Sequence, residues 1–212
     1  MYKFRFPLAL VLLSFPLLAL AQASGMSAPK EFYFDKDPQT TRPIIAVAGE
    51  GDAVVDRLAA NIARRPNEVE SHAQLAGIAM NSGRRELGED LYQTARRNAA
   101  GNQRLARMVA WNYGWDLYHA GEPERALEQW RTLLNGWPSA PSWQPPTLAL
   151  VLWKLGRRQE AIAWYAAAVR TEPQLWYDAA NLGQLLPDWR QADRDTLAEV
   201  VAAWQADPPD WP

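Results

Sequence analysis

The chain has 212 residues, a formal net charge of −2 and no cysteine. This length suits one domain of ordinary size with an N-terminal extension. The charge is far from the basic balance that nucleic-acid binding requires, so no nucleic-acid partner is expected. Without cysteine, the chain has no disulfides, no thiol catalysis, no cysteine-bound metal and no lipid-modified N-terminal cysteine.

The N-terminus carries the features of an export signal. Lys3 and Arg5 precede an apolar run over residues 6–20, and Ala19-Leu20-Ala21 ends it with small residues. A charged start, a short apolar stretch and an A-x-A site are typical of a secretory signal peptide. The run is short for a membrane-spanning helix, which needs about 20 apolar residues. We expect residues 1–21 to be removed, or 1–23 as second choice, and the mature protein to be periplasmic or secreted. The alternative is an uncleaved anchor, and only then is the membrane a partner.

Residues 22–51 are expected to form a flexible linker, since they contain three prolines and a polar cluster before residue 42. Within them, the apolar run from Ile44 to Val47 is able to pack onto the domain as a short extended piece. Gly49 and Gly51 then interrupt the chain. Asp52 is expected to cap the first helix, because aspartate is a favoured N-cap residue.

From residue 52 onward the chain has a helical pattern that repeats. Small residues allow two helices to approach closely, glycine ends a helix in the left-handed conformation, and proline prevents the next helix from continuing. One helix pair cannot bury its apolar face alone, so neighbouring pairs must stack. One set of such residues consists of Gly114, Leu117, Gly121, Ala126, Trp130 and Pro138. At an offset of 35 residues further along the chain, the equivalent positions are Ala149, Leu152, Gly156, Ala161, Tyr165 and Pro173.

This pattern resembles the tetratricopeptide repeat (TPR). The resemblance implies an all-α fold, a TPR-type α-solenoid of stacked antiparallel helix pairs. The repeat domain would cover 52–207, with units at about 69–102, 107–140 and 142–175 and a tail at 208–212. The first unit departs from the family pattern, with Gly88 in place of alanine and Ala100 in place of proline. The second has Leu133 where alanine is usual.

Helices outside the three units complete the expected stack. They cover residues 52–65, 176–186 and 193–206. The ends of a solenoid need a polar outer face. Asp193, Asp195 and Glu199 are expected to provide it on the last helix.

No catalytic arrangement emerges from the sequence. His72 and His119 lie in different units, and neither has a neighbouring histidine or cysteine that would complete a metal site. No glycine-rich loop follows a strand in the manner of a phosphate-binding loop. The acidic residues Glu86, Glu89 and Asp90 are interpreted as a solvated helix face. We therefore expect no enzyme activity, no metal and no cofactor.

The resemblance implies that a ligand lies on the concave surface made by the first helix of each pair. Trp111 and Trp115 are four residues apart and share one helix face, although core packing is the alternative interpretation of these rings. The expected function is a scaffold that binds a protein or peptide partner. The alternative is a cell-wall glycan module, in which Asn112, His119 and Gln144 would provide polar contacts beside the tryptophans. The expected groove residues are Met108, Trp111, Trp115, Tyr118, His119, Trp143, Leu150, Trp153, Lys154 and Tyr177.

Overall fold

The computed structural model describes residues 26, 29, 34–35, 42–134 and 140–210. The expected signal peptide, residues 1–21, and Pro138 lie outside these residues. The described part is helical, and two strands of two residues, β1 (Phe34–Asp35) and β2 (Ala140–Pro141), pair in parallel. The helices are α1 (Asp52–Arg64), α2 (Val69–Asn81), α3 (Arg85–Asn98), α4 (Gln103–His119), α5 (Pro123–Arg131), α6 (Gln144–Lys154), α7 (Arg158–Thr171), α8 (Pro173–Trp176), the 3-10 helix η1 (Ala179–Asn181), α9 (Leu182–Leu185) and α10 (Gln191–Ala206).

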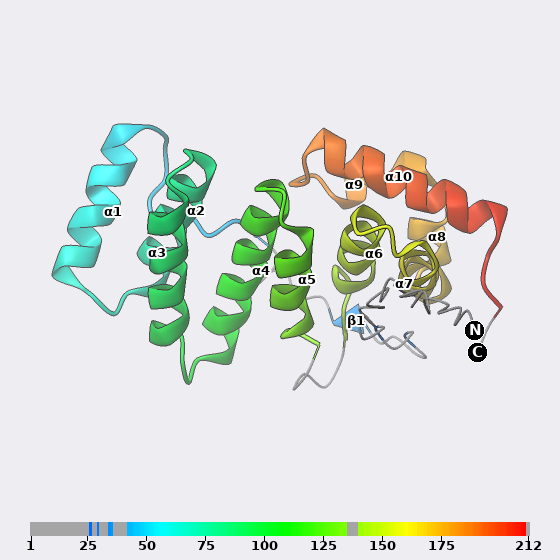
Figure 1. Ribbon diagram of the computed structural model, residues 1–212, viewed down its shortest axis with the longest axis horizontal. Helices are drawn as coiled ribbons and strands as arrows, with labels where there is room; N and C mark the ends of the chain where they lie inside the picture. Colours follow the sequence, from blue (N-terminus) through cyan, green and yellow to red (C-terminus); the bar gives the residue numbers. More distant parts are fainter. Residues whose placement is uncertain (1–25, 27–28, 30–33, 36–41, 135–139, 211–212) are drawn as a thin grey trace, which may run out of the picture.

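Three helical hairpins stand in a row, and each pairs consecutive helices: α2 with α3, α4 with α5 and α6 with α7. The row is visible in Figure 1, where α1 lies at one end against α2. Gly121 and Gly156 follow the first helix of their hairpins with φ values of 83° and 72°. The predicted left-handed helix ends are therefore confirmed. None of the helices in the described part of the chain combines the length and apolar character needed to span a bilayer.

Small residues set the distance between the two helices of the second hairpin. Trp130 on α5 is fully buried against Gly114 on α4, and a Cβ atom built at Gly114 would lie 2.2 Å from the Trp130 Nε1 atom. The same indole nitrogen donates a hydrogen bond of 3.3 Å to the carbonyl of Trp111. In the third hairpin, Ala161 and Tyr165 are likewise fully buried. The predicted packing roles of these residues are confirmed.

The helix boundaries differ from prediction at several places. Gly51, not Asp52, stands at the N-cap of α1, and Asp52 begins the helix. The helix α5 ends at Arg131, although the pattern predicted a second helix that continues toward Pro138. The single helix expected over 176–186 is divided into α8, η1 and α9. Asp178 starts a new turn there, because its carboxylate accepts a 2.9 Å hydrogen bond from the Ala180 amide.

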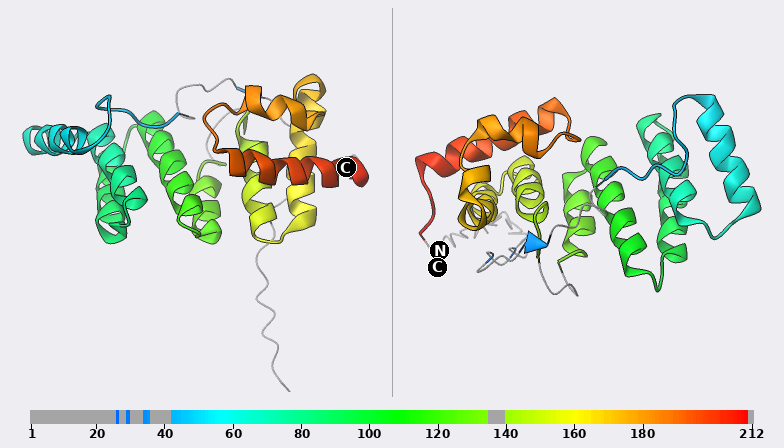
Figure 2. Two further views of the ribbon diagram at one scale, coloured as in Figure 1. Left: turned by 90° about the horizontal axis from the view of Figure 1, so that it is seen from above. Right: turned by 180° about the vertical axis from the view of Figure 1, so that it is seen from behind.

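The last helix, α10, does not extend the row of hairpins but lies across α6 and α7 (Figure 2). Its residues Leu197, Val200 and Val201 are buried in the main core. The prediction of a polar outer face on this helix is wrong for Asp193, whereas Asp195 and Glu199 are exposed as expected. Asp193 is buried, and its carboxylate lies 2.9 Å from the His119 Nε2 atom on α4. This contact joins the end of the chain to the second hairpin.

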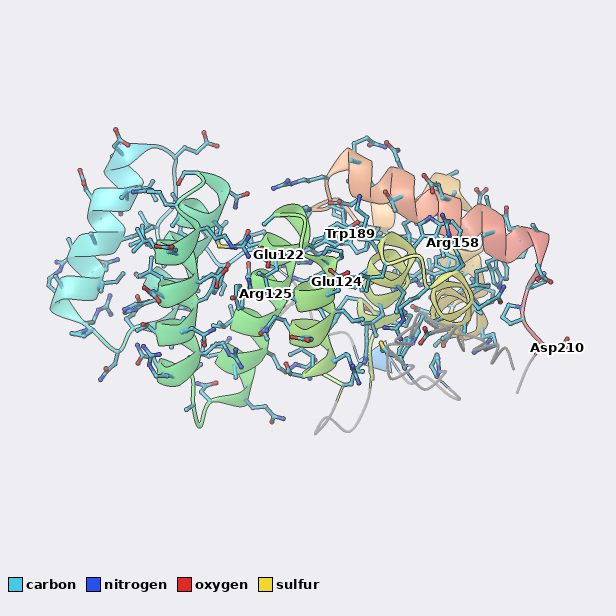
Figure 3. All side chains as sticks on the ribbon, in the orientation of Figure 1. Glu122, Glu124, Arg125, Arg158, Trp189 and Asp210 are labelled. Atoms are coloured by element: carbon cyan, nitrogen blue, oxygen red, sulfur yellow. The ribbon has the colours of Figure 1, made fainter. Side chains whose placement is uncertain are left out.

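An ion-pair network connects the first and second hairpins. Arg125 on α5 binds both carboxylate oxygens of Glu89 on α3, with distances of 2.9 and 3.1 Å. The same guanidinium reaches Glu122 at 2.7 Å and the Tyr113 hydroxyl at 3.0 Å. Figure 3 labels Arg125 and Glu122 in the second hairpin, where they take part in this network. The network lowers the pKa of Glu89 to about 2, chiefly through the hydrogen bonds from Arg125.

Replacement of Gly114 by alanine tests the close approach of α4 and α5. Alanine favours a helix by up to about 1 kcal/mol, but its methyl group would overlap the buried Trp130 ring. We expect Gly114→Ala to lower the free energy of unfolding by about 1–3 kcal/mol, as overpacking does. Gly183→Ala is the matched control, because nothing lies within 4 Å of its added Cβ. Urea unfolding of both variants decides, and equal stabilities would contradict the packing described above.

Acid titration tests the network between hairpins. Glu89 has a folded-state pKa of about 2 against an ordinary glutamate pKa of 4.5, so the unfolded chain binds its proton first as the pH falls. The stabilisation from Glu89 is complete above about pH 4.5 and is lost toward about pH 2. We expect Arg125→Met to flatten this part of the pH dependence of the unfolding free energy. Parallel curves for the variant and the wild type would show that the ion pair contributes nothing.

Candidate ligand-binding site

Several residues expected to line an open groove belong to the hydrophobic core. Trp111 is only 4% exposed, and Tyr118, Trp143 and Leu150 are also buried. The Trp143 ring lies 4.5 Å from the Trp111 ring, which it covers. Leu150 lies on α6, which α10 crosses. The prediction of an exposed aromatic groove is therefore wrong for these four residues, because later parts of the chain pack over this face.

The other expected groove residues are spread over different surroundings. Trp153 is half-buried, and its indole nitrogen donates a 2.9 Å hydrogen bond to Glu199 on α10. Lys154 is exposed at the end of α6, and Met108 is half-buried against the main core. Tyr177 is 60% exposed, with its ring 5.4 Å from that of Trp204. None of these four residues lines the cavity described next.

Trp115 and His119 do border an open space, which we call the Trp cavity. It has a volume of about 180 Å³ and lies between α4 and the segment that leads into α10. The Trp115 ring meets the Trp189 ring edge to face at 4.8 Å, and Figure 3 labels Trp189 near the start of α10. The residues that line the cavity are Pro43, Trp111, Asn112, Trp115, Asp116, His119, Asp188, Trp189, Arg190 and Asp193.

Polar side chains of the Trp cavity are held in fixed positions. The Asp116 carboxylate accepts hydrogen bonds from the Tyr92 hydroxyl at 2.5 Å and from the Asn81 amide at 3.1 Å. Burial raises the pKa of Asp116, and these hydrogen bonds partly oppose the rise. Arg190 donates a hydrogen bond of 3.2 Å to the side-chain oxygen Oδ1 of Asn81. The cavity therefore combines aromatic rings with carboxylates that neighbouring residues orient, an arrangement suited to binding.

A second, more open hollow of about 470 Å³ adjoins the Trp cavity and lies between α2 and α4. The two spaces share Pro43, Asn112 and Asp116 along their border. We call the surface of α2 and α4 that bounds both spaces the inner face. On α2 it includes Gln74 and Gly77. The two hollows thus lie next to each other along α2 and α4, the first helices of two neighbouring hairpins.

Residues 42–47, which we call the strap, cross the inner face in an extended course (Figure 2, right). The Asn112 side-chain amide accepts a hydrogen bond from the Ile44 amide at 3.1 Å and donates one to the Arg42 carbonyl at 3.1 Å. Gln74 does the same further along, accepting from the Ala46 and Val47 amides at 2.7 and 2.8 Å. It also donates to the Val47 carbonyl at 2.8 Å. Two side-chain amides therefore hold the backbone of a peptide segment.

Gln74 was not among the predicted site residues, and Asn112 was considered as a possible sugar contact but not as part of the groove. One signal for both was present in the sequence. Each lies five residues after the start of its expected unit, at Val69 and Arg107. The corresponding residue of the third unit, Thr147, is buried, and its hydroxyl donates to the Trp143 carbonyl at 2.7 Å. Gln74 and Asn112 therefore hydrogen-bond to the strap backbone, whereas the equivalent Thr147 does not.

Comparison of the chain with protein-family models finds no match, and neither do comparisons with curated proteins and with solved structures. The geometry itself defines the class: an all-helical protein of stacked hairpins with a depression along one face. Within the described ranges, no three side chains of histidine, cysteine, aspartate or glutamate gather as ligands for a metal ion. The depression offers amides, rings and carboxylates as contacts for a bound molecule.

Truncation of Trp115 tests whether this ring belongs to the core or to a free surface. Trp115 is half-buried and contacts the rings of Trp111, Trp130 and Trp189. We expect Trp115→Ala to lower the free energy of unfolding by about 3 kcal/mol or more, as large-to-small core changes do. The exposed Tyr177 is the control, and its alanine variant should stay within about 0.5 kcal/mol of wild type. Chemical denaturation measures both variants. An unchanged free energy of unfolding in Trp115→Ala would show that this ring lies on the free surface and not in the core.

Proposed function

We propose that the chain is a non-catalytic, exported scaffold of the TPR type that binds a segment of a protein partner on its inner face. The TPR assignment is supported by the repeated sequence pattern and by the helical hairpins whose first helix ends at a glycine with positive φ. The charged start and the A-x-A site in residues 1–21 support export to the periplasm or beyond the cell. The lack of a catalytic arrangement in the sequence supports a binding function.

The main support for this proposal is that Gln74 and Asn112 hydrogen-bond to the backbone of the strap. Backbone amides and carbonyls must be hydrogen-bonded when they leave water. A surface that offers side-chain donors and acceptors from two neighbouring hairpins therefore suits an extended polypeptide of varied sequence. The two amides come from neighbouring hairpins, so the bound segment must be long enough to reach from one hairpin to the next.

The Trp cavity supplies the second element of recognition. Binding hot spots are enriched in tryptophan and lie in pockets that exclude water. Trp189 is half-buried at the edge of the cavity, where it is able to contact a bound side chain. The amides would hold the backbone of the partner, and the rings would select among its side chains.

A cell-wall glycan is the second candidate ligand, and the composition of the Trp cavity favours it. Asn112 and His119, two of the three candidate sugar contacts, border the cavity beside Trp115. The third, Gln144, is buried and does not line it. The hydrogen bonds of Gln74 and Asn112 to an extended backbone have no counterpart in this alternative, which is why a protein partner is preferred.

One pair of variants separates the two ligands. We expect peptides selected from a displayed random library to bind the full chain and to lose about 2 kcal/mol of affinity or more with Trp189→Ala. Trp204→Ala is the matched control, since this half-buried ring packs on Tyr165 and Tyr177 outside the cavity. Calorimetric titration measures both. If only a glycan array yields ligands whose binding depends on Trp189, the cavity binds sugars. If neither the peptide library nor the glycan array yields such ligands, the proposed function is wrong.

A further inference from the structure

We infer that the strap, residues 42–47, is an intramolecular substitute for the partner segment, and that the partner binds by displacing it from the inner face. This inference rests on the proposed function and adds its regulation. The chain would then exist in a closed form, with the strap bound, and an open form that accepts a partner.

The bonds of the strap are those of a ligand. Its five hydrogen bonds to the inner face all go to the side-chain amides of Gln74 and Asn112. They leave the backbone hydrogen bonds of α2 and α4 untouched. Departure of the strap would therefore break no helix, and a second extended segment could make the same five bonds.

The strap side chains also follow the pattern of a bound segment. Ile44 is 7% exposed and packs into the main core, whereas the next residue, Ile45, is 68% exposed. One aliphatic side chain thus anchors the strap between the two amide grips. Val47 anchors its far end by packing with Val54 and Leu58 on α1.

The strap fits the inner face incompletely. Protein interiors are packed with few voids larger than a water molecule. The two spaces of about 180 and 470 Å³ nevertheless lie beside the strap and meet at Pro43. A partner with a larger side chain in the place of Pro43 would fill the Trp cavity and gain contacts that the strap does not make.

These observations define the partner. It is an extended protein segment with an aliphatic residue in the position of Ile44, preceded by a side chain larger than proline. A tethered segment competes at an effective concentration in the millimolar range. The closed form therefore weakens binding of the partner in proportion to the small fraction of open molecules.

The test uses two adjacent isoleucines in the full chain. Ile44→Asp places a charge in the apolar anchor and should release the strap, whereas Ile45→Asp changes an exposed residue and is the matched control. The probe is a synthetic peptide with the wild-type sequence of residues 42–48. We expect the Ile44→Asp chain to bind it at least about tenfold more tightly than the wild type or the Ile45→Asp chain, because their own straps compete.

Three results would overturn the inference. One is a folded Ile44→Asp chain that does not bind the strap peptide. Another is global loss of the folded structure in that variant, which would show that the fold itself depends on the strap. The third is concentration-dependent dimerisation of the Ile44→Asp chain in light scattering, which would assign the uncovered inner face to a second copy.

Hydrogen exchange of the wild-type chain provides a test that no variant can confound. If the strap opens locally, the amides of Ile44 and Ala46 should exchange at least about a hundredfold faster than that of Leu117 in α4. Equal rates would show that the strap leaves only on global unfolding and would refute the inference. If library peptides bind without exposing the strap amides, the proposed function stands and displacement fails. If no peptide binds even the Ile44→Asp chain, both fail.

Discussion

The contact between Trp130 and Gly114 fixes the centre of the molecule. Because Gly114 has no side chain, the largest ring of α5 lies directly against α4 and reaches the carbonyl of Trp111. The ring in turn touches Trp115 and Trp111, and Trp111 touches Trp143 at the start of the next hairpin. The second and third hairpins thus share one aromatic core that depends on a single missing Cβ atom.

This core also explains the course of the C-terminus. A continuous row of exposed tryptophans is costly on a monomer surface. The chain covers that row itself, because Trp189 packs on Trp115 and Asp193 binds His119. The helix α10 continues over α6, where Glu199 accepts a hydrogen bond from Trp153. The part of the inner face that stays open lies over α2 and α4, where Gln74 and Asn112 hold the strap beside the rings of Trp111 and Trp115.

The helical elements were largely predictable, because helix formation and its interruption are local. The periodic pattern over 52–65 predicted α1 to within one residue, and Gly121 and Gly156 end their helices as expected. The crossing of α10 was not predictable from its pattern. The same apolar positions suit a helix that continues a stack and one that lies across it. Burial of Asp193 likewise depends on His119, 74 residues away.

The site was predictable only in part, for a physical reason. Trp115 and His119, which the repeat register assigned to the groove, border a cavity, but the same register exposes Trp111 only if nothing covers it. Gln74 and Asn112 carry no apolar signal, so a search for aromatic contacts passes over them. Their equivalence appears once hydrogen bonding is considered, since both hold an extended backbone from the same place in consecutive units. Rings placed between hairpins therefore hold the hairpins together, and the amides on the inner face bind the strap.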